Sequence, residues 1–146
     1  MFVTPWLLLN ESRPILGEPS IFSSSGFETM FRNKPGLRQP YSETMAYVRS
    51  SGAAEVGLIM GRDTWEYPAW VLLNSDRRLT PIRIEQICIP PKSGPKEDPS
   101  FKPQIAVLLG RNATETINCE SGTFKREVSF GSGRDQLVVY HRVGDN

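Results

Sequence analysis

The sequence feature that most constrains the fold is the stretch Ala53–Leu73, in which an apolar run, a tight turn and an aromatic-rich segment follow one another. Residues 56–60 read Val-Gly-Leu-Ile-Met and are bounded by Gly61. A short run without polar alternation is typical of a central strand that is covered on both faces. This stretch therefore predicts a buried strand that turns sharply into a second element packed against it.

The second element is predicted to be a helix. Pro68 is acceptable only in the first turn of a helix, so we expect the helix to begin near Tyr67 and to end at Asn74 or Ser75. Trp70 and Leu73 are expected to be buried on one face of this helix, where each contributes about 1.5–3 kcal/mol.

The rest of the chain predicts a small α/β domain. The spacing of Tyr41, Met45 and Val48 indicates a helix over 41–51, with Ser42 as its N-cap and Gly52 as its C-cap. Further strands are expected at Ile82–Ile89, near a sheet edge, at Gln104–Leu109, and at Thr123–Phe130 and Gln136–Val143, in which Phe124, Val128 and Phe130 share one face. The predicted fold class is α/β, with a small Rossmann-like sheet built on a βαβ core and a C-terminal β-hairpin.

The 146 residues suggest one folded domain with an N-terminal extension. Residues 1–9 are almost wholly apolar and are interpreted as either a first strand or the end of a membrane helix. Residues 10–39 are expected to form a covering loop segment with a short helical turn at 26–31. Residues 40–146 form the predicted α/β domain.

Composition excludes several classes of function. The net charge is +1 and no Lys/Arg cluster stands out, which argues against a dedicated nucleic-acid binder. The chain has one histidine and two cysteines that are not spaced as a metal knuckle, so neither a metal nor a cofactor is expected. Cys88 and Cys119 are either buried free thiols or one disulfide, and a disulfide would require an oxidising compartment.

The candidate site follows the predicted central strand, at the edge where α/β sheets usually bind ligands. Asp63 and Glu66 are either an acid/base pair or, more simply, caps for the N–H groups of the helix. Aromatic side chains here either stack on sugar rings or anchor the core. The predicted ligand-binding residues are Arg62, Asp63, Trp65, Glu66 and Tyr67. The Gly-x-Gly-x-x-Gly motif of dinucleotide sites is absent, and His141, which has no Ser or Cys motif to pair with, is interpreted as structural.

Two segments resemble a known family. One is Thr4-Pro-Trp-Leu-Leu-Leu-Asn-Glu-Ser-Arg-Pro-Ile, followed by Ser20-Ile-Phe, and the other is Glu55–Leu73. Together they resemble the end of the last membrane helix and the soluble C-terminal tail of bacterial polytopic glycosyltransferases of the dolichyl-phosphate-mannose protein mannosyltransferase type. The resemblance covers about the first half of the chain.

The resemblance implies a non-catalytic domain on the extracytoplasmic face of the cell membrane. The membrane core of the parent protein would be its partner and would use lipid-linked sugar donors, and the domain itself would contact that core or a glycan. The catalytic acidic residue of that family lies in a part to which nothing here corresponds, so no catalytic residue is carried over. A Cys88–Cys119 bridge would fit this location. The alternative is a free-standing ligand-binding module for a sugar or nucleotide at the predicted site, and an enzyme resting on Asp63 and Glu66 alone is a third possibility.

Overall fold

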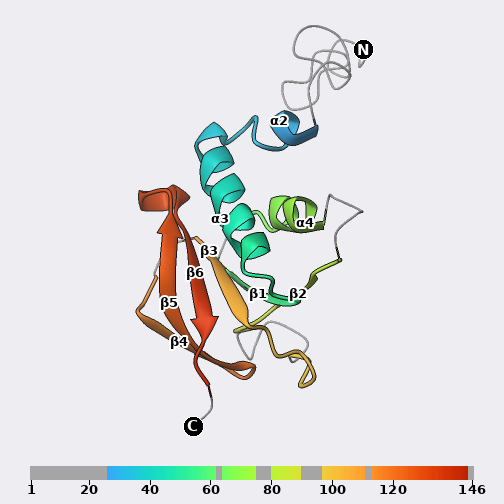
Figure 1. The fold of residues 1–146 in the computed structure, drawn as a ribbon. Coiled ribbons are helices and arrows are strands. Elements are labelled where there is room, and N and C mark those ends of the chain that lie inside the picture. The colour runs from blue at the N-terminus through green and yellow to red at the C-terminus, as the bar shows by residue number, and fades with distance from the viewer. Residues whose placement is uncertain (1–25, 62–63, 75–79, 90–96, 111–112, 145–146) are drawn as a thin grey trace, which may run out of the picture. The chain divides into compact units, whose positions relative to one another are not determined.

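The computed structural model describes residues 26–61, 64–74, 80–89, 97–110 and 113–144 (Figure 1). The chain divides into two compact units, Met1–Arg38 and Gln39–Asn146. The predicted apolar segment 1–9 and residues 10–25 of the predicted covering segment lie outside the described residues. The described part of the first unit contains helix α2 (Gly26–Met30), which confirms the predicted helical turn, and a 3-10 turn, η1 (Pro35–Leu37).

The second unit is built on a six-stranded mixed sheet in the order β2-β1-β3-β6-β5-β4. Its strands are β1 (Glu55–Met60), β2 (Arg83–Gln86), β3 (Ile105–Leu109), β4 (Thr116–Cys119), β5 (Gly122–Phe130) and β6 (Leu137–Arg142). β1 pairs in parallel with both β2 and β3, whereas β3, β6, β5 and β4 pair in antiparallel fashion. The sheet curls, and its α/β class agrees with the prediction.

The mid-chain prediction is confirmed. β1 is an inner strand whose residues 56–59 are buried, and α4 (Tyr67–Asn74) leads from it to the parallel edge strand β2. Leu73 is fully buried, as expected, but Trp70 is 42% exposed, so the predicted burial of Trp70 is wrong. On a helix of only eight residues, the core-facing side is filled by Pro68, Ala69 and Leu73, and Trp70 falls outside that side.

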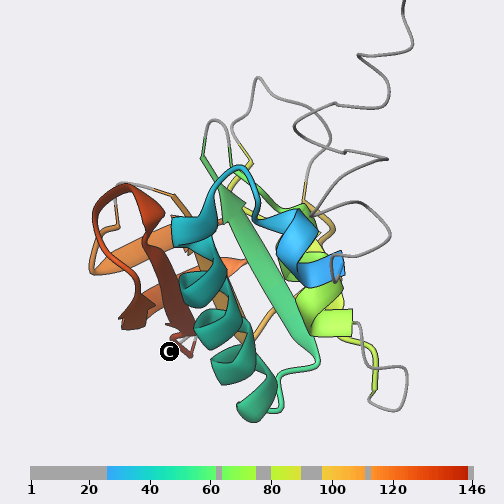
Figure 2. The same cartoon turned by 90° about the horizontal axis from the view of Figure 1, so that it is seen from above.

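Helix α3 (Arg38–Ser50) begins three residues earlier than predicted. Pro40 lies in its first turn, where a missing N–H costs nothing, and Ser42 therefore lies inside the helix and is not its N-cap. The predicted C-terminal end is correct, because Gly52 adopts the left-handed conformation (φ +72°) that ends many helices. α3 and α4 lie on the same face of the sheet, over β1 (Figure 2).

The face of the sheet opposite α3 and α4 carries a hydrophobic core of its own, which we call the second core. Strand side chains alternate between faces, so β1, β3 and β6 each contribute to both layers. The buried members of this second core are Ile59, Ile87, Phe101, Ala106, Leu108, Phe124, Val138 and Tyr140. Ile87 packs directly on Gly57: a Cβ on Gly57 would lie 2.5 Å from Ile87 Cδ1. Gly57 therefore permits close packing, as glycine inside a strand often does.

The C-terminal hairpin of β5 and β6 is present, but it belongs to a three-stranded meander, because β4 was not predicted. β5 contains a bulge between Arg126 and Val128. A bulge inserts one residue and reverses the alternation beyond it. Phe124 therefore lies in the second core, whereas Val128 pairs with Val139 on the helix side. The expectation that Phe124 and Val128 share one face is wrong for this reason.

Candidate functional site

The residues predicted to bind a ligand follow β1. Arg62 and Asp63 lie outside the described residues. The carbonyl of Glu66 accepts the N–H groups of Ala69 (2.9 Å) and Trp70 (3.3 Å), so Glu66 immediately precedes α4 and its side chain is exposed. A side chain that caps the helix from its first turn would have to lie at the third helical position, and Glu66, which precedes the helix, does not occupy it.

The two aromatic members of the predicted site point to different environments. Tyr67 is 67% exposed, whereas Trp65 is half-buried and its carbonyl accepts a hydrogen bond from the Tyr41 hydroxyl. Burial and the nearby charge of Glu66 raise the pKa of Tyr41 well above its usual range. Trp65 thus helps to hold the turn against α3. Neither of the two cavities described below is lined by Trp65, Glu66 or Tyr67.

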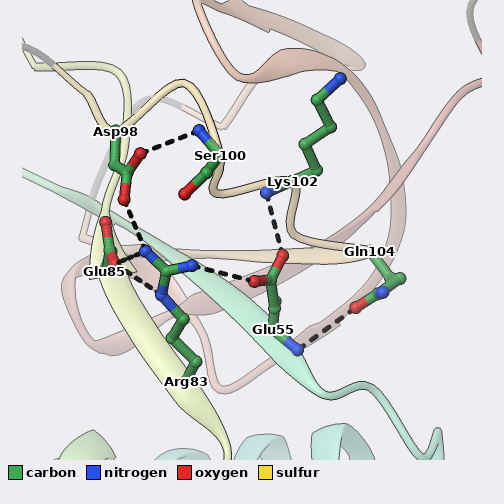
Figure 3. A network of polar contacts seen from close by, with 7 residues as sticks. All are labelled: Glu55, Arg83, Glu85, Asp98, Ser100, Lys102 and Gln104. Carbon is green, nitrogen blue, oxygen red and sulfur yellow. Dashed lines mark hydrogen bonds and ion pairs between the residues drawn. The ribbon is translucent and has the colours of Figure 1, made fainter.

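A charged network occupies the other end of the parallel strands (Figure 3). Arg83 donates to Glu85 at 2.7 Å, to Glu55 at 3.3 Å and to Asp98 at 2.7 Å. Its guanidinium also lies 5.1 Å from the centroid of the Phe101 ring. The carboxylates raise the pKa of Arg83, with the hydrogen bond to Glu85 as the largest cause.

Backbone groups bind the same carboxylates. Glu55 accepts the N–H of Lys102 at 2.9 Å, and Asp98 accepts the N–H of Ser100 at 2.8 Å. This bond and the Ser100 hydroxyl, followed by Arg83, lower the pKa of Asp98. The Lys102 ammonium points away from the network (Figure 3). The network joins β1, β2 and the segment before β3, and we interpret it as structural.

A second carboxylate holds the disulfide region. Cys88 and Cys119 form a disulfide that closes a separation of 31 residues. Glu97 accepts hydrogen bonds from the backbone N–H groups of Cys88, Ile89 (3.3 Å) and Ser121 (2.9 Å). One side chain therefore binds the backbone on both sides of the bridge. A cavity of about 390 Å³ lies beside the Glu97 carboxylate. Its lining residues are Glu97, Asp98, Pro99, Phe101, Lys102, Glu120, Ser121, Gly122 and Arg142.

A groove of about 400 Å³ lies between the end of α3, the segment that leads into β1, and the strands β3, β5 and β6. Its lining residues are Tyr47, Ser51, Gly52, Ala53, Ala54, Gln104, Ile105, Glu127 and His141. Three of them interact. His141 Nδ1 lies 3.9 Å from Glu127 Oε2, and a hydrogen bond to Glu127, together with some burial and the charge of that carboxylate, raises the pKa of Tyr47. We call Tyr47, Glu127 and His141 the groove triad.

The sequence pattern does not indicate this site. His141 is expected to be structural, and Glu127 belongs to a strand for which no binding role is predicted. The pairing of β5 with β6 and the packing of α3 bring Glu127 beside Tyr47, 80 positions earlier in the chain. Long-range packing of this kind leaves no periodic pattern in the sequence. A break in the alternation around Arg126 and Val128 is the one local signal available.

Searches of known proteins give this chain no relatives, since no family model, no curated protein and no solved structure matches it. Within the described residues, no group of three or more His, Cys, Asp or Glu side chains is arranged to hold a metal ion. Likewise, none of the helices in the described ranges has the length and apolar character needed to cross a bilayer.

Proposed function

We propose that this chain is a non-catalytic, extracytoplasmic α/β domain of a membrane-embedded glycosyltransferase-like protein that uses lipid-linked sugar donors. The observation that carries the proposal is the Cys88–Cys119 disulfide. Disulfides persist in oxidising compartments and are rare in the cytosol. A bridge in this position supports an extracytoplasmic location. The membrane core of the parent protein, as the partner of the domain, is proposed from the family resemblance alone.

The arrangement of charges supports a non-catalytic role. In the described residues, Arg83, Glu55 and Asp98 bind one another and the backbone, and Glu97 binds three backbone N–H groups. Carboxylates engaged in this way position the chain and are poorly placed to exchange protons with a substrate. The strand order β2-β1-β3, with α4 between β1 and β2, supports a Rossmann-like origin for the parallel half of the sheet.

The location is tested by trapping thiols in the producing cells. Acid-quenched cells are treated with a maleimide polymer before and after reduction, and we expect a two-thiol gel shift only after reduction. The Cys88→Ser variant is the control, because its remaining thiol should be labelled without reduction. Reaction of both wild-type thiols without reduction would contradict an oxidising location.

Membrane parentage needs a separate measurement. Carbonate-washed membranes should retain the native polypeptide, and a protease added outside spheroplasts should remove this domain. Recovery of the native polypeptide in the soluble fraction would disprove the membrane-embedded parent even if the disulfide is present.

A second candidate function is a free-standing ligand-binding module for a sugar or nucleotide. The groove of about 400 Å³ favours the sugar form of this alternative, because small-molecule sites typically occupy roughly 300–1,000 Å³ and no Lys or Arg lines the groove to bind the phosphates of a nucleotide. Its position differs from the predicted site, which followed β1. Retention in the soluble fraction together with ligand binding would favour this alternative.

A further inference from the structure

The groove triad lies at an irregularity in β5. In the ladder, Arg126 pairs with Tyr140 and Val128 pairs with Val139, so Glu127 is the extra residue of the bulge. Bulges are common beside functional sites, where they redirect a side chain. Glu127 lies next to His141 of β6, and its carboxylate interacts with Tyr47 of α3.

The groove combines hydrogen-bonding groups of several kinds with an aromatic wall. Its hydroxyl, amide, carboxylate and imidazole groups come from Tyr47, Ser51, Gln104, Glu127 and His141. Most of these groups both donate and accept. Two of them already bind the backbone: the Gln104 amide oxygen accepts the N–H of Glu55 at 3.3 Å, and the Ser51 hydroxyl donates to the carbonyl of Val48 at 2.6 Å and accepts the N–H of Ala53 at 3.3 Å. The set matches a ligand that carries several hydroxyls, because each hydroxyl also donates and accepts.

The aromatic wall of the groove is the Tyr47 ring, which contacts a second aromatic side chain. The Tyr47 ring packs on Phe130, with their centroids 5.9 Å apart and their planes at 53°. The groove is also lined by Gly52, Ala53 and Ala54, which are small residues. An aromatic ring beside convergent polar groups is the usual composition of a small-molecule site.

The charge of the groove indicates which ligands it disfavours. None of its lining residues is Lys or Arg, the usual partners of phosphate and carboxylate groups. Lys125 pairs with His141 in the ladder but does not line the groove. Glu127 carries the formal negative charge, and His141 lies beside it. An anionic ligand would therefore meet a carboxylate without a lining cation to offset it.

We infer that the groove between α3 and the β5 bulge binds a neutral, hydroxyl-rich ligand of the carbohydrate class through Tyr47, Glu127 and His141. Glu127 accepts hydrogen bonds from ligand hydroxyls, and the Tyr47 ring packs against the apolar face of a sugar ring. This inference does not depend on the proposed membrane parent, because binding is a property of the isolated chain.

The test uses the single histidine of the chain as a reporter. The His141 ring resonance of the ¹³C-labelled protein is followed by NMR during separate titrations with glucose, mannose, galactose and N-acetylglucosamine. Inorganic phosphate and ethylammonium are the comparison ligands. We expect at least one sugar to shift the resonance saturably, and phosphate and ethylammonium to leave it unchanged.

Variants locate the binding. Glu127→Gln and Tyr47→Phe should each raise the dissociation constant, Glu127→Gln by about tenfold, as expected for the loss of a hydrogen bond to a charged group. Glu120→Gln is the matched control, because it makes the same charge change at an exposed residue of the other cavity and should not affect binding. Tyr47→Phe removes one hydroxyl and provides an independent test if Glu127→Gln does not fold.

Three results would overturn the inference. One is the absence of a shift with every sugar at high millimolar concentration. Another is a saturable response to phosphate or ethylammonium alone, which would assign the groove to a charged ligand. The third is an equal loss of binding in Glu120→Gln, which would show that the groove triad does not carry the interaction.

Discussion

The contact between Gly57 and Ile87 offers a sharp test of the packing described here. In Gly57→Ala, the added Cβ would lie 2.5 Å from Ile87 Cδ1 and 2.9 Å from Ile87 Cγ1. Ile87 is fully buried and Gly57 lies on an inner strand, so neither can move without disturbing the second core. Overpacking of this kind costs about 1–3 kcal/mol.

Backbone entropy acts in the opposite direction. Alanine loses less backbone entropy on folding than glycine, so this term stabilises an alanine variant inside a strand by about 0.5–1 kcal/mol. Packing should win over most of this range, and the net destabilisation of Gly57→Ala is expected to be about 0–2.5 kcal/mol. For a domain of this size, each kcal/mol lowers the thermal midpoint by about 4 °C.

The assay is urea and thermal unfolding followed by circular dichroism, with Gly61→Ala as the control. A Cβ on Gly61 would meet its nearest neighbours at 3.6 Å, an ordinary contact, so this variant should be neutral or slightly stabilising. In the double variant Gly57→Ala/Ile87→Ala, the two costs should not add, because the new methyl group occupies space vacated by Ile87. Equal stability of Gly57→Ala and Gly61→Ala, or simple additivity, would refute the reasoning.

Three further predictions concern the disulfide and two titrating groups. The Cys88→Ser/Cys119→Ser variant should lose about 3–4 kcal/mol of unfolding free energy in urea, and an unchanged midpoint would show that the bridge adds no stability. Tyr41→Phe should cost about 1 kcal/mol, because a backbone carbonyl loses its donor. The folded state raises the Tyr41 pKa, so the neutral Tyr41 hydroxyl contributes to the free energy of unfolding below about pH 10. This contribution is lost as the pH rises through the raised folded pKa. Tyr41→Phe should therefore flatten the loss of stability in alkaline unfolding curves. The Ser100 groups lower the pKa of Asp98, so the ionised Asp98 carboxylate contributes to the free energy of unfolding above about pH 4. This contribution is lost as the pH falls through the lowered folded pKa. An Asp98→Asn variant whose stability falls with acid as steeply as that of the wild type would contradict this.

The local elements could be predicted from the sequence because each rests on short-range physical chemistry. The apolar run at 56–60 must avoid water on both faces, which makes it an inner strand. Pro68 restricts where the following helix begins, and Gly52 supplies the left-handed residue that ends α3. These signals act within a few residues, so they survive in a single sequence.

Other features depend on contacts between distant segments. Trp70 is partly exposed because the neighbours of a short helix decide which of its apolar residues are covered. The bulge in β5 arises from its pairing with β6, and it changes the face of every residue beyond it. Strand β4 is half-exposed and short, so its sequence carries little periodicity.

The candidate site also depends partly on local and partly on long-range features. The amino-acid sequence alone determined which residues are polar, which are aromatic and where the chain turns, and it predicted a ligand site at the residues after β1. Only the tertiary structure brought Tyr47, Glu127 and His141 into one groove and Cys88 within reach of Cys119. The physical reason is that hydrophobic periodicity encodes burial along one element, whereas a site is made by the register and packing between elements.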